Sequence, residues 1–263
     1  MNNHFYVTLP SDSSATYYPN NTVARFVTKL PERIRLEGDY EVGLAEIVYP
    51  HSWYNIDTSS GDYWMGFESV DGNIKKFYLD SGYYANPSEL AHRLTQEIAA
   101  GLDVYAHDPN LKIKFIYDAT LSKFKIDLRT KDQLPSFYAS SDFQRLLGFD
   151  SGWIAIHGSK VANNVFELNR GLNLMYVYCD VAAHTVVGDT KTPLLRVCNV
   201  TGNHGEAVRQ TYIQPHYVPV GRREFDSIEI AINNEHGKPI PFEYGKSVIT
   251  LHFRRRHNFL KAS

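Results

Sequence analysis

The chain has 263 residues, of which 43% are hydrophobic and 21% are charged, a composition that is typical of a folded protein and excludes an intrinsically disordered one. The formal net charge of −2 at pH 7 argues against a general role in packaging nucleic acid, which requires a positive field. The length fits one large domain or one domain carrying a smaller insert. Aromatic residues make up 13%, which favours β structure because aromatic rings suit pleated surfaces.

Three further features bear on where the protein resides. The N-terminal sequence MNNHFYVTLPSDSS has no basic start followed by an apolar core, so we expect no secretory signal. No apolar run approaches the roughly 20 residues that span a bilayer. Cys179 and Cys198 are too few for a disulfide framework, and we expect two free thiols. These observations predict a soluble protein that is made without export and does not insert into membranes.

Alternating apolar and polar residues predict β-strands in the N-terminal part of the chain, at residues 23–30, 33–49, 62–70 and 74–79. One stretch, YEVGLAEIVYP, carries a carboxylate in its apolar row, because Glu46 follows Val42 and Leu44 at the same spacing. One explanation is a β-bulge or a change of face before Pro50, which returns Glu46 to water. A second explanation depends on a family resemblance and is given with it below.

The middle of the chain differs from both ends. The sequence NPSELAHRLTQEIAAGL predicts a helix in which Asn86 is the N-cap, Pro87 takes the first position and Glu89 completes a capping box. Its apolar face consists of Leu90, Leu94, Ile98 and Leu102. Two strands at 112–118 and 123–128 and a helical turn ended by Gly148 follow. We therefore expect a small α+β insertion domain over residues 80–150.

Strands dominate again near the C-terminus, at residues 174–181, 194–200, 225–232 and 247–255. Turn residues separate them, and no crossover helices lie between them, which favours an antiparallel arrangement. Because each end of the chain needs the other to complete its sheets, we expect one discontinuous mostly-β domain made of residues 1–79 and 151–263. The simplest architecture is an antiparallel sandwich.

The sequence lacks the common motifs of catalysis and cofactor binding. The sequence contains no His-x-His pair, no His-Glu-x-x-His, no Gly-x-Ser-x-Gly elbow and no glycine-rich phosphate loop. Cys179 with His184 and Cys198 with His204 are spaced too loosely to indicate zinc, and buried apolar cysteines are expected instead. We therefore expect no enzyme activity, no cofactor and no metal.

Two groups of residues are candidates for contacts with other molecules. Arg254, Arg255, Arg256 and His257 form the one dense basic cluster. It is either a solvated tail or a contact with an acidic neighbour or a nucleic acid. Trp53 lies among several tyrosines close to loops, where aromatic residues serve either core packing or protein interfaces.

The segment YYPNNTVARFVTKLPERIRLEGDYEVGLAEIVYPHSWYNI, residues 17–56, resembles the N-terminal signature of penton-type minor capsid proteins of Polinton (Maverick) elements and adintoviruses. This lineage includes adenoviruses and virophages. Further matches follow in the same order: SGYYANPSEL, FQRLLGF, MYVYCDVAAHTVVGDTKTPLLRV and FDSIEIAINNEHGKPIPFEYGKSVITLHFRRR. The resemblance spans essentially the whole chain, and its specificity lies in the combination. One departure is Tyr40, where family members more often carry tryptophan.

The resemblance implies a jelly-roll protein that forms homopentamers at the vertices of an icosahedral capsid and is surrounded there by major capsid protein. The insert would project as a second domain, and the protein would reside in the virion and have no catalytic residues. It also supplies the second explanation of Glu46, which would face a neighbouring subunit and pair with a basic group there. The candidate intersubunit or capsid contacts are Glu46, Trp53, Arg254, Arg255 and Arg256. The alternative is a host jelly-roll module that binds a ligand or partner, such as a lectin-like domain, and an enzyme is a third possibility.

Overall fold

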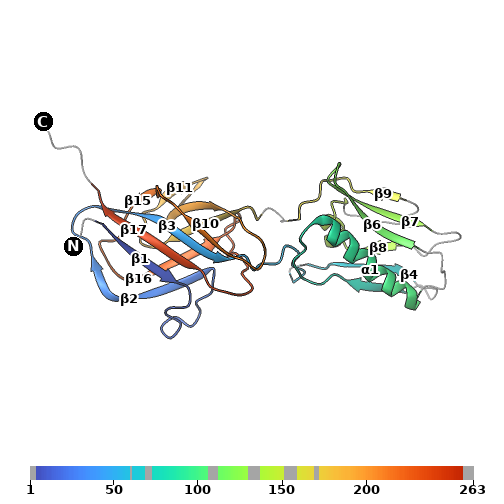
Figure 1. The fold of residues 1–263 in the computed structure, drawn as a ribbon, viewed down its shortest axis with the longest axis horizontal. Coiled ribbons are helices and arrows are strands. Elements are labelled where there is room, and N and C mark those ends of the chain that lie inside the picture. The colour runs from blue at the N-terminus through green and yellow to red at the C-terminus, as the bar shows by residue number, and fades with distance from the viewer. Residues whose placement is uncertain are drawn as a thin grey trace. The chain divides into compact units, whose positions relative to one another are not determined.

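The computed structural model describes residues 4–59, 61–68, 73–105, 112–129, 137–150, 159–168 and 172–256. The chain divides into two compact units, one consisting of Met1–Trp53 and Gly171–Ser263 and the other of Tyr54–Arg170. The first unit brings together strands from both ends of the chain, blue and red in Figure 1.

The first unit is a sandwich of two antiparallel sheets. One sheet has the order β1-β17-β3-β14, with β15 also paired to β3, and the other has the order β13-β10-β16-β2. The strands are β1 (His4–Pro10), β2 (Arg25–Arg35), β3 (Tyr40–Pro50), β10 (Leu174–Cys179), β13 (Leu194–Asn199), β14 (Ala207–Thr211), β15 (Tyr217–Pro219), β16 (Glu224–Asn233) and β17 (Val248–Arg255). A separate hairpin joins β11 (Thr185–Val187) to β12 (Thr190–Thr192).

The order of these strands is that of a jelly roll. When β14 and β15 are taken as one interrupted strand, the first, third, sixth and eighth strands in chain order form one sheet, and the second, fourth, fifth and seventh form the other. Strand β1 pairs along its whole length with β17, from His4 opposite Arg254 to Pro10 opposite Val248. The predicted antiparallel jelly-roll sandwich is therefore confirmed, and segments more than 200 residues apart complete each other's sheets.

The core lies between the two sheets and is lined by alternate residues of each strand. Fully buried side chains come from β3, β10, β16 and β17, and include Val42, Leu44, Ile47, Val177, Ile228, Ile230, Ile232, Ile249, Leu251 and Phe253. Each such aliphatic side chain stabilises the fold by about 1.5–3 kcal/mol relative to exposure in water. Strands that were recognised from period-2 alternation thus place their apolar row inward.

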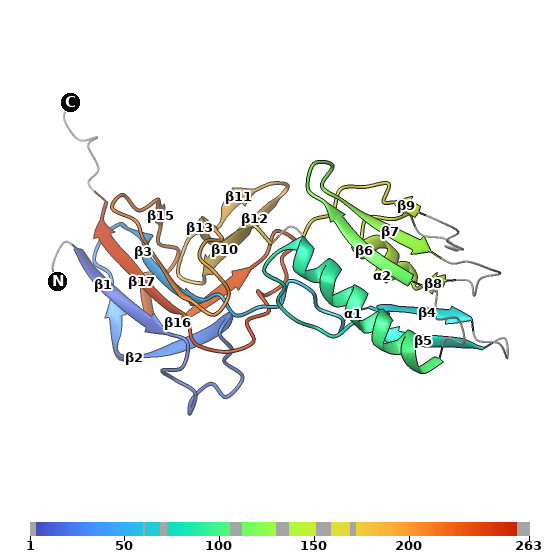
Figure 2. The ribbon, with the colours of Figure 1, turned by 45° about the vertical axis from the view of Figure 1, so that its right-hand side comes forward.

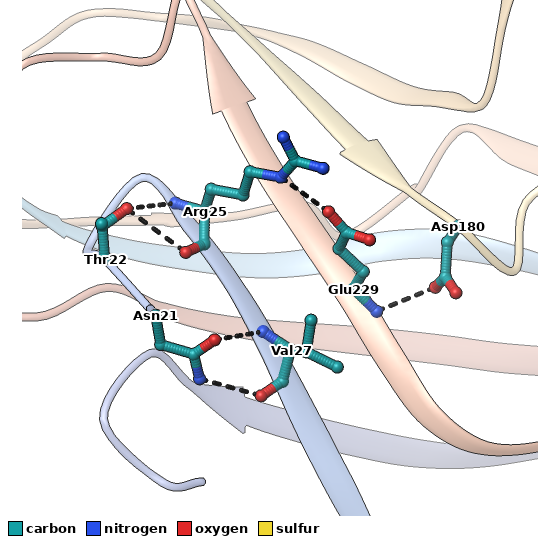
Figure 3. A network of polar contacts seen from close by, with 6 residues as sticks. All are labelled: Asn21, Thr22, Arg25, Val27, Asp180 and Glu229. Atoms are coloured by element: carbon teal, nitrogen blue, oxygen red, sulfur yellow. Dashed lines mark hydrogen bonds and ion pairs between the residues drawn. The ribbon is translucent and has the colours of Figure 1, made fainter. Parts of the chain in front are cut away.

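Strand β2 is an edge strand of the sheet β13-β10-β16-β2, and the loop that precedes β2 covers this edge. The side chain of Asn21 pairs with the backbone of Val27 as a strand would, donating to its carbonyl oxygen and accepting from its N–H at 2.9 Å each (Figure 3). Farther along, the Ser14 hydroxyl accepts a hydrogen bond of 3.0 Å from the N–H of Lys29. These side chains occupy backbone groups that an unpaired edge would otherwise offer to another chain.

In its described residues, the second unit contains two three-stranded sheets and two helices. The sheets have the orders β5-β4-β8 and β6-β7-β9, and α1 packs against β5 and β6 (Figure 2). The elements are β4 (Trp64–Glu68), β5 (Ile74–Tyr78), α1 (Pro87–Tyr105), β6 (Lys112–Asp118), β7 (Lys123–Arg129), β8 (Phe137–Ala139), α2 (Ser141–Leu146) and β9 (Ser159–Val161). This unit has its own hydrophobic core, which shares no buried residue with that of the sandwich.

Helix α1 begins as predicted. The Glu89 N–H donates to Asn86 Oδ1 at 2.9 Å, and the Glu89 carboxylate accepts from the N–H of Ala85 at 2.7 Å, one residue farther back than in a standard capping box. Leu90, Leu94 and Ile98 are fully buried, whereas the side chain of Leu102 lies outside the described residues. Helix α2 ends at Leu146, and Gly148 follows its C-cap residue Leu147 with a φ of +82°, a conformation that favours glycine.

The second unit is larger than the expected insert of residues 80–150. Residues 54–79 and 151–170 were expected in the sandwich, but both belong to the second unit. Strands β4 and β5 pair with each other, and β4 pairs with β8, so neither joins the jelly roll. Alternation identifies a strand without identifying the sheet that it joins, which explains the misplaced boundary.

Candidate interaction surface

Glu46 lies beside a β-bulge in β3. Thr250 of β17 lies opposite Glu46, whereas the next residue, Leu251, lies opposite Leu44. Ala45 is therefore an extra residue that shifts the alternation by one position. The buried aliphatic and aromatic side chains of β3 are accordingly Tyr40, Val42, Leu44, Ile47 and Tyr49. The bulge, one of the two explanations of this carboxylate, removes Glu46 from the apolar row.

The carboxylate of Glu46 has partners within its own chain. Its Oε2 accepts a hydrogen bond of 3.1 Å from the Thr211 hydroxyl, and Arg209 Nε lies 3.9 Å from the same oxygen. The Glu46 side chain keeps 27% of its surface exposed. The residue is thus anchored to β14 through one carboxylate oxygen and remains accessible on the outer face of the sheet.

A cluster of aromatic and charged residues lies farther along the sheet that contains β1, β17, β3 and β15; we call it the Tyr6 patch, and it consists of Tyr6, Glu41, Tyr217, His252 and Arg254. The Arg254 guanidinium lies 3.5 Å from the centre of the Tyr217 ring and forms an ion pair with Glu41. The Tyr217 hydroxyl is 2.7 Å from His252 Nδ1. Tyr6 stacks on His252 at 4.4 Å and is 60% exposed. Exposed tyrosine beside arginine is common in protein interfaces.

Most of the Tyr6 patch was not predicted from the sequence. Neither β1, which carries Tyr6, nor β15, which carries Tyr217, was recognised, and Glu41 and His252 were not singled out on the strands that were predicted. The signal for β1 was present, since Phe5, Val7 and Leu9 alternate with His4 and more polar neighbours. Only Arg254 was recognised, as part of the basic cluster. The structure places Arg254 in an ordered contact with Tyr217 rather than in a free tail.

The two following arginines are less constrained. The Arg255 guanidinium lies over Gly38, so close that a Cβ there would be 3.2 Å from it. The Arg256 N–H donates to the carbonyl oxygen of Asp39 at 2.8 Å. Both side chains are exposed, and within the described part of the chain neither pairs with a carboxylate. His257, which completes the basic cluster, lies outside the described residues.

Trp53 is a core residue of the sandwich rather than a surface residue. Its side chain is 4% exposed, stacks on His51 at 4.1 Å between ring centres, and meets Phe242 edge-on at 5.7 Å. In this position the indole presents almost no surface to a second subunit. Of the five sequence-predicted contact residues, Glu46 and the three arginines therefore lie at the surface, and Trp53 does not.

The described residues were compared with three requirements: a reactive thiol, a metal site and a membrane-spanning helix. Cys179 and Cys198 are free thiols, as predicted, and burial raises the pKa of Cys179 to about 12, so that the reactive thiolate is disfavoured. Among the residues that the structure describes, no three potential ligands gather as a metal site would require. In the same residues, no helix combines the length and apolarity needed to cross a membrane.

The second unit contains a cleft of about 360 Å³ between α1 and the segment that follows β5. Its lining combines tyrosines with charged and amide side chains, the main members being Tyr78, Asp80, Tyr83, Tyr84, Glu89, Arg93, Gln96 and Glu97. No sequence motif indicated this cleft. Its residues come from separate elements, and neither strand alternation nor helical periodicity predicts that these elements contact each other.

Together these features define the class of protein: a jelly-roll sandwich with an α+β unit inserted between its third and fourth strands. Among solved structures, the chain is similar to the mavirus penton protein, with a TM-score of 0.53, 11% sequence identity, and coverage of 95% of this chain and 99% of that chain. No family model matches the sequence. No curated protein matches it either. At this identity the likeness shows a shared fold: the chain has the fold of the mavirus penton protein.

Proposed function

We propose that this chain is a penton-type minor capsid protein, five copies of which form each vertex of an icosahedral shell. The observation that carries the proposal is the likeness to the mavirus penton protein, which covers nearly all of both chains and so includes the inserted unit as well as the sandwich. The ordered motifs shared with the penton-type proteins of Polinton elements and adintoviruses support the same lineage. The protein is then structural rather than enzymatic, and it resides in the virion.

The proposed partners are further copies of the chain and the surrounding major capsid protein. In a ring, each subunit presents one patch to a different patch on its neighbour, so charge pairing fixes the register. Glu46 suits this role because Oε2 holds both of its described contacts, with Thr211 and Arg209, which leaves Oε1 for a basic group of the next subunit. The exposed Arg255 and Arg256 suit contact with an acidic surface of the major capsid protein.

The oligomeric state tests the proposal directly. We expect light scattering after size-exclusion chromatography to give a mass five times that of one chain, either for the protein alone or after mixing with the major capsid protein of the same genome. A host module that binds a ligand, the alternative function, would stay monomeric under both conditions. That result would contradict the capsid role.

Charge reversal tests the proposed seam separately from the pentamer itself. We expect Glu46→Lys to lower the pentameric fraction because two positive groups would then meet across the seam. Asp12→Lys is a matched control, since Asp12 is an exposed carboxylate that pairs only at 3.4 Å with Lys246 in the described residues. If Glu46→Lys assembles as well as the control does, the seam lies elsewhere while the pentamer stands.

The basic cluster is tested by the combined replacement of Arg255 and Arg256 with alanine. We expect this variant to form pentamers but to co-assemble with the major capsid protein only at reduced salt, because exposed ion pairs are screened by salt. Unchanged co-assembly together with lost binding to DNA would instead assign the two arginines to nucleic acid.

A further inference from the structure

The cleft of the second unit has a wall that is fixed in place before any ligand arrives. Buried Asn55 clamps the backbone of Tyr84, donating to its carbonyl oxygen at 2.8 Å and accepting from its N–H at 2.9 Å. The Ser81 hydroxyl accepts a hydrogen bond of 2.9 Å from the N–H of Thr58. Two side-chain clamps thus hold the segment 81–84 against the segment 55–58, and preorganisation of this kind lowers the entropic cost of binding.

The two sides of the cleft differ in chemistry. The end of β5 and the segment after it contribute aromatic rings, those of Tyr78, Tyr83 and Tyr84, together with Leu79 and the polar Asp80 and Ser81, and Met65 of β4 adds a further apolar side chain. Helix α1 contributes polar side chains at positions separated by three or four residues, namely Glu89, His92, Arg93, Gln96 and Glu97. A molecule that fills the cleft therefore meets mostly aromatic and apolar surface on the β5 side, where Asp80 is the charged exception, and mostly hydrogen-bonding groups on the α1 side, where Leu94 is the apolar exception.

The charges in the cleft disfavour strongly charged ligands. Three carboxylates, those of Asp80, Glu89 and Glu97, outnumber the one guanidinium, that of Arg93, so an anion is repelled. Two of the carboxylates are already engaged, because Glu89 accepts from a backbone N–H and Glu97 pairs with Arg93 at 2.6 Å. A cation would therefore meet only one carboxylate outside these two contacts, that of Asp80.

The hydrogen-bonding groups include both donors and acceptors. Arg93 and Gln96 donate, and the carboxylates together with the Gln96 carbonyl oxygen accept. The Tyr84 ring is half-buried, and this burial raises the pKa of its hydroxyl, which stays protonated at neutral pH and can donate as well as accept. Such a mixture suits neutral hydroxyl groups, each of which is a donor and an acceptor at once.

We propose that this cleft binds a neutral carbohydrate. A pyranose ring has one apolar C–H face, which would lie on the tyrosine side, and a rim of hydroxyl groups, which would reach the polar face of α1. The volume of about 360 Å³ falls in the range of small-molecule sites. The proposal stands independently of the capsid role, since it concerns the inserted unit alone.

Saturation-transfer NMR on the full chain tests the proposal with defined probes. The neutral probes are N-acetylglucosamine, methyl β-galactopyranoside and methyl α-mannopyranoside, and the charged probes are N-acetylneuraminic acid and Nα-acetyl-lysine amide. We expect saturation of the ring C–H protons of at least one neutral probe at millimolar concentration, and none of the charged probes. Arg93→Ala and Tyr84→Ala should each weaken that binding by about tenfold, which is about 1.4 kcal/mol.

Arg145→Ala is the matched control, because Arg145 is an exposed arginine of α2 that forms an intrahelical ion pair with Asp142 and does not line the cleft. The control should bind the sugar as the parent chain does. If Tyr84→Ala fails to fold, Arg93→Ala decides alone, since the Arg93 side chain is 54% exposed. Binding of no neutral probe, preference for a charged probe, or binding that both cleft variants leave unchanged would overturn the proposal.

Discussion

Cys179 illustrates how the core controls a reactive side chain. Its thiol lies between the sheets, and burial raises its pKa to about 12, so at pH 8 only about one molecule in ten thousand carries the thiolate. Cys198 is also buried, with its pKa raised in the same direction. We expect neither thiol of the native protein to react with iodoacetamide at pH 8, and both to react in denaturant. Mass spectrometry counts the modifications, and rapid labelling of the native chain would contradict the buried arrangement.

His252 is expected to make stability depend on pH. Burial lowers its pKa below 6.5, and the nearby His4 and Arg254 lower it further. Because the folded state favours neutral His252, its contribution is present above pH 6.5 and is lost as pH falls through the folded pKa. We therefore expect the free energy of unfolding to decrease from pH 7 to pH 5, and to decrease less in His252→Asn. Urea unfolding at both pH values measures this, and an equal loss in the variant would exclude His252 as a cause.

Glu46 shows what residue patterns can and cannot predict. The sequence revealed that a carboxylate interrupts an apolar row, and it suggested a bulge as one cause. It did not reveal that Ala45 is the extra residue, because a bulge depends on the partner strand, here β17, whose register is set by contacts far along the chain. Similarly, no local pattern distinguishes Trp53 in a core from a tryptophan at an interface.

At the scale of single elements, the contribution of the Asn21 hydrogen bonds that cover the edge strand β2 can be tested by substitution. Asn21→Ala removes both hydrogen bonds to the Val27 backbone, and we expect it to lower the free energy of unfolding by about 1–2 kcal/mol. Asn20→Ala is the matched control, since Asn20 is exposed and its side chain forms no hydrogen bond among the described residues. Urea unfolding of the two variants and the parent gives the comparison. If Asn21→Ala is as stable as the parent, water satisfies the Val27 backbone groups without a loss in the free energy of unfolding.

Strands and helices differed in how far the sequence predicted them. Helix α1 has a cap, a first-turn proline and an apolar face within one segment, so local residues suffice to locate it. Strands β4 and β5 were recognised but assigned to the sandwich, because the pairing that places them in the other sheet, that of β4 with β8, joins segments about 70 residues apart. The short β14 and β15 were not predicted, since β15 has only three residues and the sequence AVRQT of β14 contains too few apolar residues to form an alternating row.

At the scale of the whole molecule, the two units have separate hydrophobic cores, which implies separate stabilities. Leu44 is fully buried in the core of the sandwich, and Leu94 is fully buried in that of the second unit. Replacement of a buried leucine by alanine costs about 2–5 kcal/mol, because it removes apolar contacts and leaves a cavity. If the cores are independent, each replacement should destabilise only the unit that contains it.

Hydrogen exchange followed by mass spectrometry can locate the destabilisation in the intact chain. We expect Leu94→Ala to accelerate exchange in peptides from Tyr54–Arg170 while peptides from the sandwich keep the rates of the parent, and Leu44→Ala to do the reverse. The two variants serve as controls for each other, since the same side chain is truncated in both. Acceleration in both units by either variant would show that the inserted unit and the jelly roll unfold as one cooperative structure. The separate cores would then not correspond to separately folding domains, and a ligand bound in the cleft would stabilise the jelly-roll sandwich as well.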